Sequence, residues 1–140
     1  MNQVLFMLKT IPEYAALVQG LNQGESAAVT GIGQINRSHL IAGLSQETKR
    51  PIVILVQDEM AARRLQEELK CFLGSEIPVL PGRDLTFYDA AVVSRAWEQK
   101  RLRQLYALGR GETPIQIFSW ESISQRTLPP QVFSKAVITL

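Results

Sequence analysis

The chain has 140 residues, which suits one domain with a single hydrophobic core. Apolar residues make up 46% of it and charged residues 20%, values that are typical of globular proteins and exclude a disordered chain. The formal net charge of +2 is too small to indicate nucleic-acid binding by itself, and no apolar run approaches the roughly 20 residues that span a bilayer. We therefore expect a cytoplasmic protein without a membrane partner.

One cysteine and one histidine limit the chemistry that the side chains can supply. Cys71 has no second cysteine, so an internal disulfide framework is excluded. Cys71 and His39 together are too few to build a zinc site, and we expect no metal site. Because Cys71 follows a helical pattern beside Phe72, we interpret it as a buried, unreactive thiol.

The beginning of the chain predicts a helix, a linker and a strand. Thr10 and Glu13 have the spacing of a capping box, which favours a short helix over residues 12–20. Residues 1–24 then form an N-terminal helix and a linker. The first strand is predicted over residues 26–30.

The middle of the chain predicts two helices and two strands. Asn36 is a candidate cap for the first of these helices. Residues 52–56 are a run of β-branched and leucine residues that suits a strand buried on both faces, as in a parallel sheet. Asp58 should cap the next helix and Gly74 should end it. A short third strand is predicted over residues 77–80.

The last part of the chain predicts a loop over residues 83–91 and a long helix over residues 92–109. A fourth strand over residues 114–118 precedes Ser119, which should cap a short helix. Residues 136–140 predict a fifth strand. Alternation of strands and helices at this spacing favours right-handed crossovers, and hence a three-layer α/β domain with a mostly parallel sheet of about five strands.

Residues 28–35, which we call the altered loop, have the outline of a phosphate-binding loop between a strand and a helix. The consensus is G-x-x-x-x-G-K-[S/T], in which the lysine reaches the β/γ-phosphates and the hydroxyl binds Mg²⁺. Gln34 replaces the lysine and carries no charge, and Ile35 replaces the hydroxyl and cannot ligate magnesium. We therefore expect no catalytic residue, no bound cofactor and no hydrolysis here. The positions that define the altered loop are Ala28, Thr30, Gly31, Gly33, Gln34 and Ile35. The alternative interpretation is a plain turn between a strand and a helix.

Two further groups of side chains allow more than one interpretation. The basic residues Arg95, Lys100, Arg101 and Arg103 could contact DNA phosphates or an acidic surface of another domain, or could form an ordinary solvated helix face. The loop over residues 83–91 contains acidic and aromatic residues that could form a paired-carboxylate site, or could cap a helix and pack against the sheet edge. The residues of this loop are Asp84, Phe87, Tyr88 and Asp89.

Three segments, in order, resemble the N-terminal part of bacterial transcription-repair coupling factors, the part that is similar to the first domain of the excinuclease B subunit. The resemblance covers residues 17–140. Its segments are AAVTGIGQINRSHLIAGL, RPIVILVQDEMAARRLQEELKCFL and DLTFYDAAVVSRAWEQKRLRQLYAL. The third is the most specific, because it keeps the family's spacing of the pairs Tyr88-Asp89, Arg101-Leu102 and Leu105-Tyr106.

The resemblance implies a RecA-like domain, residues 1–140, at the N-terminus of a larger multidomain protein. It implies that the parent protein is an ATP-dependent DNA translocase, which displaces stalled RNA polymerase and recruits nucleotide excision repair. ATP and magnesium would act in a motor downstream of this chain, so the fragment itself would be non-catalytic. The implied partners are the remaining domains of the parent and, through the parent, RNA polymerase, the excinuclease A subunit and double-stranded DNA. The excinuclease B subunit keeps an intact loop at residues 28–35, so the altered loop favours the coupling factor. The alternative is a fragment of that subunit or of another nucleotide-binding, helicase-like enzyme.

Overall fold

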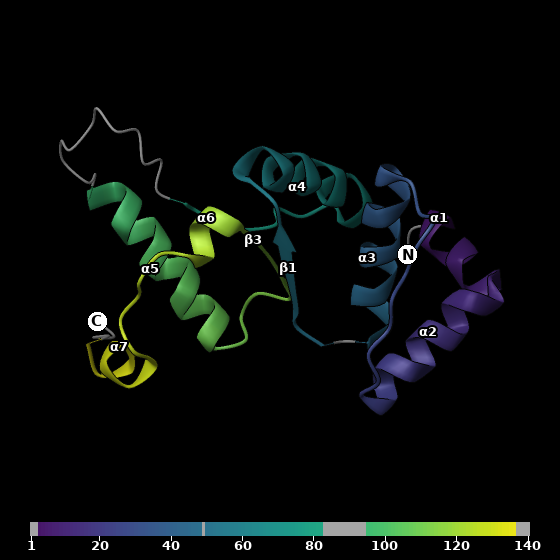
Figure 1. Cartoon of the computed structure of the whole chain (residues 1–140), viewed down its shortest axis with the longest axis horizontal. Coiled ribbons are helices and arrows are strands. Elements are labelled where there is room, and N and C mark those ends of the chain that lie inside the picture. The colour runs from purple at the N-terminus through teal and green to yellow at the C-terminus, as the bar shows by residue number, and fades with distance from the viewer. Residues whose placement is uncertain (1–2, 49, 83–94, 137–140) are drawn as a thin grey trace.

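The structure, a computed structural model, describes residues 3–48, 50–82 and 95–136. Its elements in chain order are α1 (Gln3–Phe6), η1 (Met7–Thr10), α2 (Pro12–Gln23), α3 (Gln34–Thr48), β1 (Ile52–Val56), α4 (Glu59–Leu73), β2 (Val79–Leu80), α5 (Arg95–Gly109), β3 (Ile115–Ser119), α6 (Trp120–Ile123) and α7 (Pro130–Ala136). Figure 1 shows an elongated molecule with α1 and α2 at one end, α5 and α7 at the other, and the sheet between them.

The described strands form one parallel sheet in the order β1-β3-β2, so the fold is α/β as predicted. β3 is the central strand, and all five of its residues are buried. Ile52 pairs with Ile115 and Val56 with Ser119, which fixes the register of β1 along the whole of β3. The predicted strand over residues 52–56 is confirmed with the same bounds, and the predicted fourth strand is confirmed one residue later.

The described sheet has three strands, and the expectation of about five is not confirmed. The prediction of a strand over residues 26–30 is wrong, because these residues are exposed and form no strand. Their composition explains this result: the segment is Ser-Ala-Ala-Val-Thr, so Val29 is its one large apolar side chain and pairing it to the sheet would bury little apolar surface. The third strand is shorter than predicted. The predicted fifth strand falls on residues 136–140; Ala136 ends α7 and the others lie outside the described residues.

Helix α4 covers the first face of the sheet with an apolar core. Buried residues of β2, β3 and α4 form this core together with Ala42 of α3 and with Ile77, which precedes β2. The helix begins where predicted: the Asp58 side chain accepts a hydrogen bond from the backbone N–H of Ala61 at 2.7 Å. Gly74 ends the helix with a φ of 68°, a left-handed conformation that glycine adopts without a Cβ clash. Both predicted caps of α4 are confirmed.

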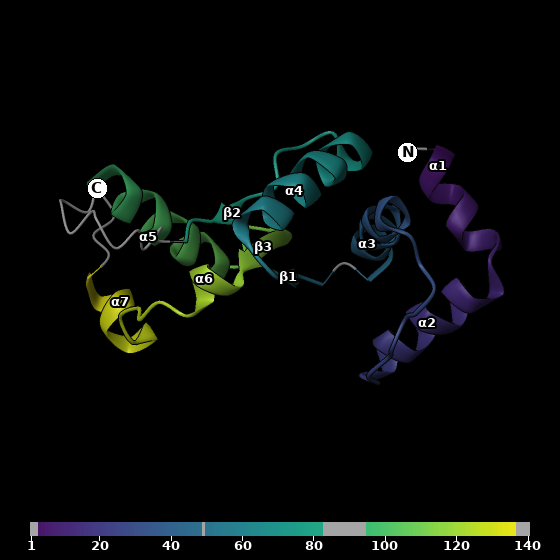
Figure 2. The same ribbon diagram turned by 45° about the horizontal axis from the view of Figure 1, so that its top comes forward.

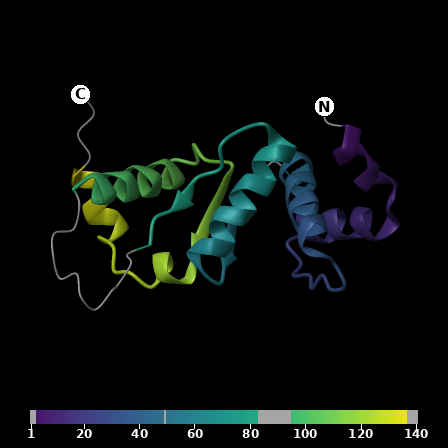
Figure 3. The same cartoon turned by 90° about the horizontal axis from the view of Figure 1, so that it is seen from above.

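The second face of the sheet is only partly covered. Leu80 and Phe118 are buried on this face, and α5 lies beside β2 (Figure 3). Val53 and Leu55 of β1 point to the same face, because side chains alternate along a strand, but they are 58% and 55% exposed. The prediction that β1 is buried on both faces is therefore wrong for the second face.

The N-terminal helices pack on α3, apart from the sheet (Figure 2). Leu8 and Tyr14 are buried and approach Gly43 of α3 so closely that a Cβ at this position would lie 2.5 Å from Leu8 Cδ1. An ion pair of 2.7 Å between Lys9 and Glu47 crosses the same contact at the surface. The small Gly43 therefore lets η1 and α2 approach the backbone of α3.

Several local predictions need correction. The capping box is not formed: Ile11 is the N-cap of α2, and the Thr10 hydroxyl instead donates to the carbonyl of Met7. Asn36 lies inside α3 and does not cap it. Cys71 is exposed rather than buried, because it follows buried Leu69 by two positions and so faces the other side of α4. The predicted cap at Ser119 is confirmed.

Candidate functional site

The altered loop leads into α3 through an exposed turn. Residues 26–31 are all exposed, and Gly31 has a φ of 76°, which a residue with a side chain rarely adopts. Helix α3 begins at Gln34, so the two replaced positions, Gln34 and Ile35, stand in its first turn. Ile35 is 70% exposed, although it is a large apolar residue.

A hollow of about 530 Å³ lies at the start of α3. The residues that line it come from the altered loop, the first turn of α3 and one side of α4: Gly33, Gln34, Ile35, Asn36, Arg64 and Glu68. The N-terminus of a helix has free N–H groups and a partial positive charge, which favour an anion. Arg64 adds a positive charge, and Glu68 opposes it.

Glu68 is held against the buried hydroxyl of Ser38. The Ser38 hydroxyl donates a hydrogen bond to Oε2 of Glu68, which ties α3 to α4 beside the hollow. The rings of His39 and Phe72 stack 5.2 Å apart between the same two helices. Glu68 supplies the one carboxylate among the described residues that line the hollow. Its hydrogen bond with Ser38 fits a structural role.

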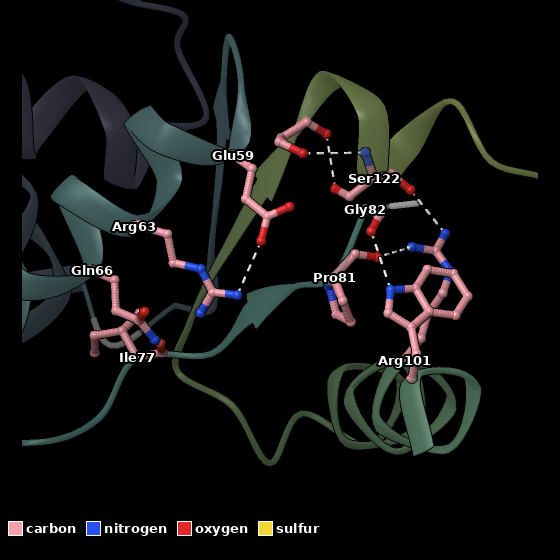
Figure 4. Close-up of polar contacts among 10 residues, drawn as sticks. Glu59, Arg63, Gln66, Ile77, Pro81, Gly82, Arg101 and Ser122 are labelled. Carbon is pink, nitrogen blue, oxygen red and sulfur yellow. Dashed lines mark hydrogen bonds and ion pairs between the residues drawn. The ribbon is translucent and has the colours of Figure 1, made fainter. Parts of the chain in front are cut away.

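Asp58 and Glu59 follow β1 after Gln57, at the carboxyl end of the sheet, where acidic residues of nucleotide-hydrolysing enzymes hold magnesium. Sequence reasoning did not single out this pair as a site. The structure gives each carboxylate a local partner: Asp58 caps α4, and Glu59 pairs with Arg63 at 3.0 Å (Figure 4). Within residues 3–48, 50–82 and 95–136, no group of three or more histidine, cysteine, aspartate or glutamate side chains is arranged to hold a metal ion.

The structure separates the basic residues of α5. Arg95, Lys100 and Arg103 are exposed, as a solvated or ligand-binding helix face requires. Arg101 is buried, with 6% of its surface exposed, so an ordinary solvated position is excluded for it. Its guanidinium donates to the carbonyl of Pro81 at 2.9 Å and to that of Ser122 at 2.8 Å (Figure 4). Burial lowers the pKa of Arg101 from its ordinary value.

Trp97 stands one turn before Arg101 and contacts the same region. Its indole N–H donates to the carbonyl of Gly82 at 3.1 Å, and the guanidinium of Arg101 lies 5.9 Å from the ring centroid (Figure 4). Arg101 and Trp97 thus bind α5 to the segments that follow β2 and β3. The spacing of four residues placed both side chains on one face of a helix, but it gave no sign that this face would be buried. The candidate residues Asp84, Phe87, Tyr88 and Asp89 lie outside the described residues.

The fold and the site together define an α/β domain with a small parallel sheet, whose loop before α3 lacks the lysine and the hydroxyl of a phosphate-binding loop. Two transcription-repair-coupling factors resemble this chain. The protein from Bacillus subtilis (strain 168) is 26% identical over 132 residues, which is 93% of this chain and 11% of the relative. The protein from Myxococcus xanthus is 28% identical over 124 residues, which is 83% of this chain and 10% of the relative.

The chain is therefore a domain related to the transcription-repair-coupling factors, as the sequence motifs predicted. It spans about a tenth of the length of these curated relatives. No protein-family model matches the chain, and no solved structure matches it significantly. Among the helices of the described residues, none combines the length and the apolar character that crossing a membrane requires.

Proposed function

We propose that this chain is a non-catalytic domain of a transcription-repair coupling factor. The observation that carries the proposal is the similarity to two such factors across most of the chain. The altered loop supports the non-catalytic part, since Gln34 and Ile35 supply neither the charge nor the magnesium ligand of a working loop. We further propose that the domain has a RecA-like architecture like that of the excinuclease B ATPase domain.

The parent protein would be a cytoplasmic, ATP-dependent DNA translocase that displaces stalled RNA polymerase. In this proposal ATP and magnesium bind the parent's motor, outside this chain. The chain would contribute to assembly with the other domains of the parent. Through the parent it would act with RNA polymerase, double-stranded DNA and the excinuclease A subunit in nucleotide excision repair.

Isothermal titration of the chain with Mg-ATP tests the non-catalytic role. We expect no measurable heat of binding and no release of phosphate. Gly33→Trp fills the turn beside the hollow, and Gly109→Trp is its control, because a Cβ at Gly109 meets no heavy atom within 4 Å. Micromolar affinity that is lost in Gly33→Trp and kept in Gly109→Trp would refute the proposal. That result would favour the alternative, a fragment of a nucleotide-binding enzyme such as the excinuclease B subunit.

A further inference from the structure

Helices α4 and α5 are attached to the sheet by different forces. Helix α4 meets the first face through apolar side chains that form the core, with Ala62 and Leu69 fully buried. Apolar burial of this kind is non-directional and tolerates small shifts. Helix α5 lies against β2 (Figure 3), and its buried polar groups include the guanidinium of Arg101 and Oε1 of Gln104.

The second face of the sheet contains a buried polar side chain without a partner. Gln116 lies in the middle of β3, is fully buried, and neither its Oε1 nor its Nε2 forms a hydrogen bond. Oε1 of Gln104 on α5 and the hydroxyl of Thr113, just before β3, are buried without partners as well. A buried polar atom without a partner loses its bonds to water and gains nothing in return. Oε1 of Gln104 therefore opposes the burial of this side of α5, and the amide of Gln116 opposes the covering of the second face.

Three directional hydrogen bonds hold α5 in place instead. They run from Trp97 to Gly82 and from Arg101 to Pro81 and Ser122, and all three acceptors are backbone carbonyls. Bonds of this kind are lost together when the helix moves by more than about 1 Å, because hydrogen bonds weaken steeply with distance and angle. We call this pair of side chains, Trp97 and Arg101, the α5 latch.

We propose that α5 opens away from the sheet as a separate unit, held closed by the α5 latch, while α4 and the sheet stay folded. Proteins open in cooperative segments of unequal stability, and the least apolar contact opens first. Opening uncovers Leu80 and Phe118 beside Val53 and Leu55, which are already exposed on the same face. The second face then exposes apolar side chains on all three strands, with the amide of Gln116 between them.

Hydrogen exchange measured by mass spectrometry tests this proposal on the whole chain. Peptides from α5 should exchange at least about tenfold faster than peptides from α4, which is the ratio expected when opening differs by one hydrogen bond from a charged donor. Arg101→Lys keeps the charge but cannot reach both carbonyls, and it should speed exchange in α5 by a further factor of about ten without changing α4. Arg103→Lys, an exposed change in the same helix, is the control and should change neither.

A second variant tests the opposing polar atoms independently of the latch. Gln116→Met has nearly the same volume and removes the unpaired amide, so it should slow exchange in α5 severalfold. Equal exchange of α4 and α5 in the unaltered chain would refute the proposal, even if Arg101→Lys fails to fold. An equal acceleration of both helices by Arg101→Lys would also refute it, as would faster exchange of α5 in Gln116→Met.

Discussion

Replacement of Gly43 by alanine tests how the N-terminal helices are attached to α3. The new Cβ would lie 2.5 Å from Leu8 Cδ1 and 2.9 Å from the hydroxyl oxygen of Tyr14, so both side chains must move. Inserting a methyl group into a filled site costs about 1–3 kcal/mol, whereas replacing glycine by alanine inside a helix gains about 1 kcal/mol. We therefore expect Gly43→Ala to lower the free energy of unfolding by about 0–2 kcal/mol.

Gly109→Ala separates these two contributions. Gly109 ends α5 in open space, where the added Cβ meets no heavy atom within 4 Å, so this variant reports the helix preference alone. Urea unfolding of both variants should show Gly43→Ala less stable than Gly109→Ala by about 1–3 kcal/mol, with unchanged m-values.

A double-mutant cycle with Leu8→Ala identifies the clashing group. Leu8→Ala removes Cδ1, so Gly43→Ala should cost about 1 kcal/mol less in that background than in the unaltered chain. Equal stability of Gly43→Ala and Gly109→Ala would contradict a clash at Gly43. An equal cost of Gly43→Ala with and without the Leu8 side chain would show that Leu8 is not the clashing group.

Three further predictions concern single side chains. Asp58→Ala should lower the free energy of unfolding by about 1 kcal/mol in urea titrations, and Asp58→Asn, which keeps an acceptor for the cap, by less than half of that. Burial raises the pKa of Tyr14 above its ordinary value of about 10, and Glu47 adds to the shift, so the folded state holds the proton more tightly. The stability that the protonated Tyr14 hydroxyl contributes is present below pH 10 and is lost as the pH rises through the folded-state pKa. Tyr14→Phe should therefore remove this loss of stability at alkaline pH. An unchanged dependence of stability on pH in Tyr14→Phe would contradict the raised pKa of Tyr14. Arg101→Ala should lower the free energy of unfolding by about 2–3 kcal/mol in thermal or urea unfolding, because two carbonyls lose a charged donor. Arg103→Ala, at an exposed position, should change the free energy of unfolding by no more than about 0.5 kcal/mol. Equal losses of stability in the two variants would contradict the burial of Arg101.

The parts of the fold that the sequence predicted well depend on local chemistry. The five residues of β1 form a continuous apolar run, and Asp58 and Gly74 supply the two caps of α4 that their side chains favour. The cap at Ser119 follows the same rule. Such features are decided by neighbours within a few residues, so they can be predicted from one sequence.

The parts that the sequence did not predict depend on contacts between distant residues. Whether residues 26–30 join the sheet depends on how well their side chains pack against a neighbouring strand, and small side chains provide little packing. Arg101 has the same local pattern as exposed Arg103, and only the carbonyls of Pro81 and Ser122 distinguish it. Within the candidate site the loss of the lysine and the hydroxyl was visible in the sequence, but the tie between Ser38 and Glu68 beside the hollow was not.

The position of β3 between β1 and β2 has a consequence for synthesis of the chain on the ribosome. Both outer strands pair with β3, yet β3 is the last of the described strands to be made, and Ser119 follows Val56 by 63 positions (119 − 56). At about 5–20 residues per second, β1 waits about 3–13 s for the strand that it pairs with. During this interval the run Ile52–Val56 is an unpaired apolar segment without a charge, which is the kind of segment that aggregates or binds chaperones. The stretch that forms the sheet most readily is thus also the stretch that needs protection while the nascent chain is incomplete.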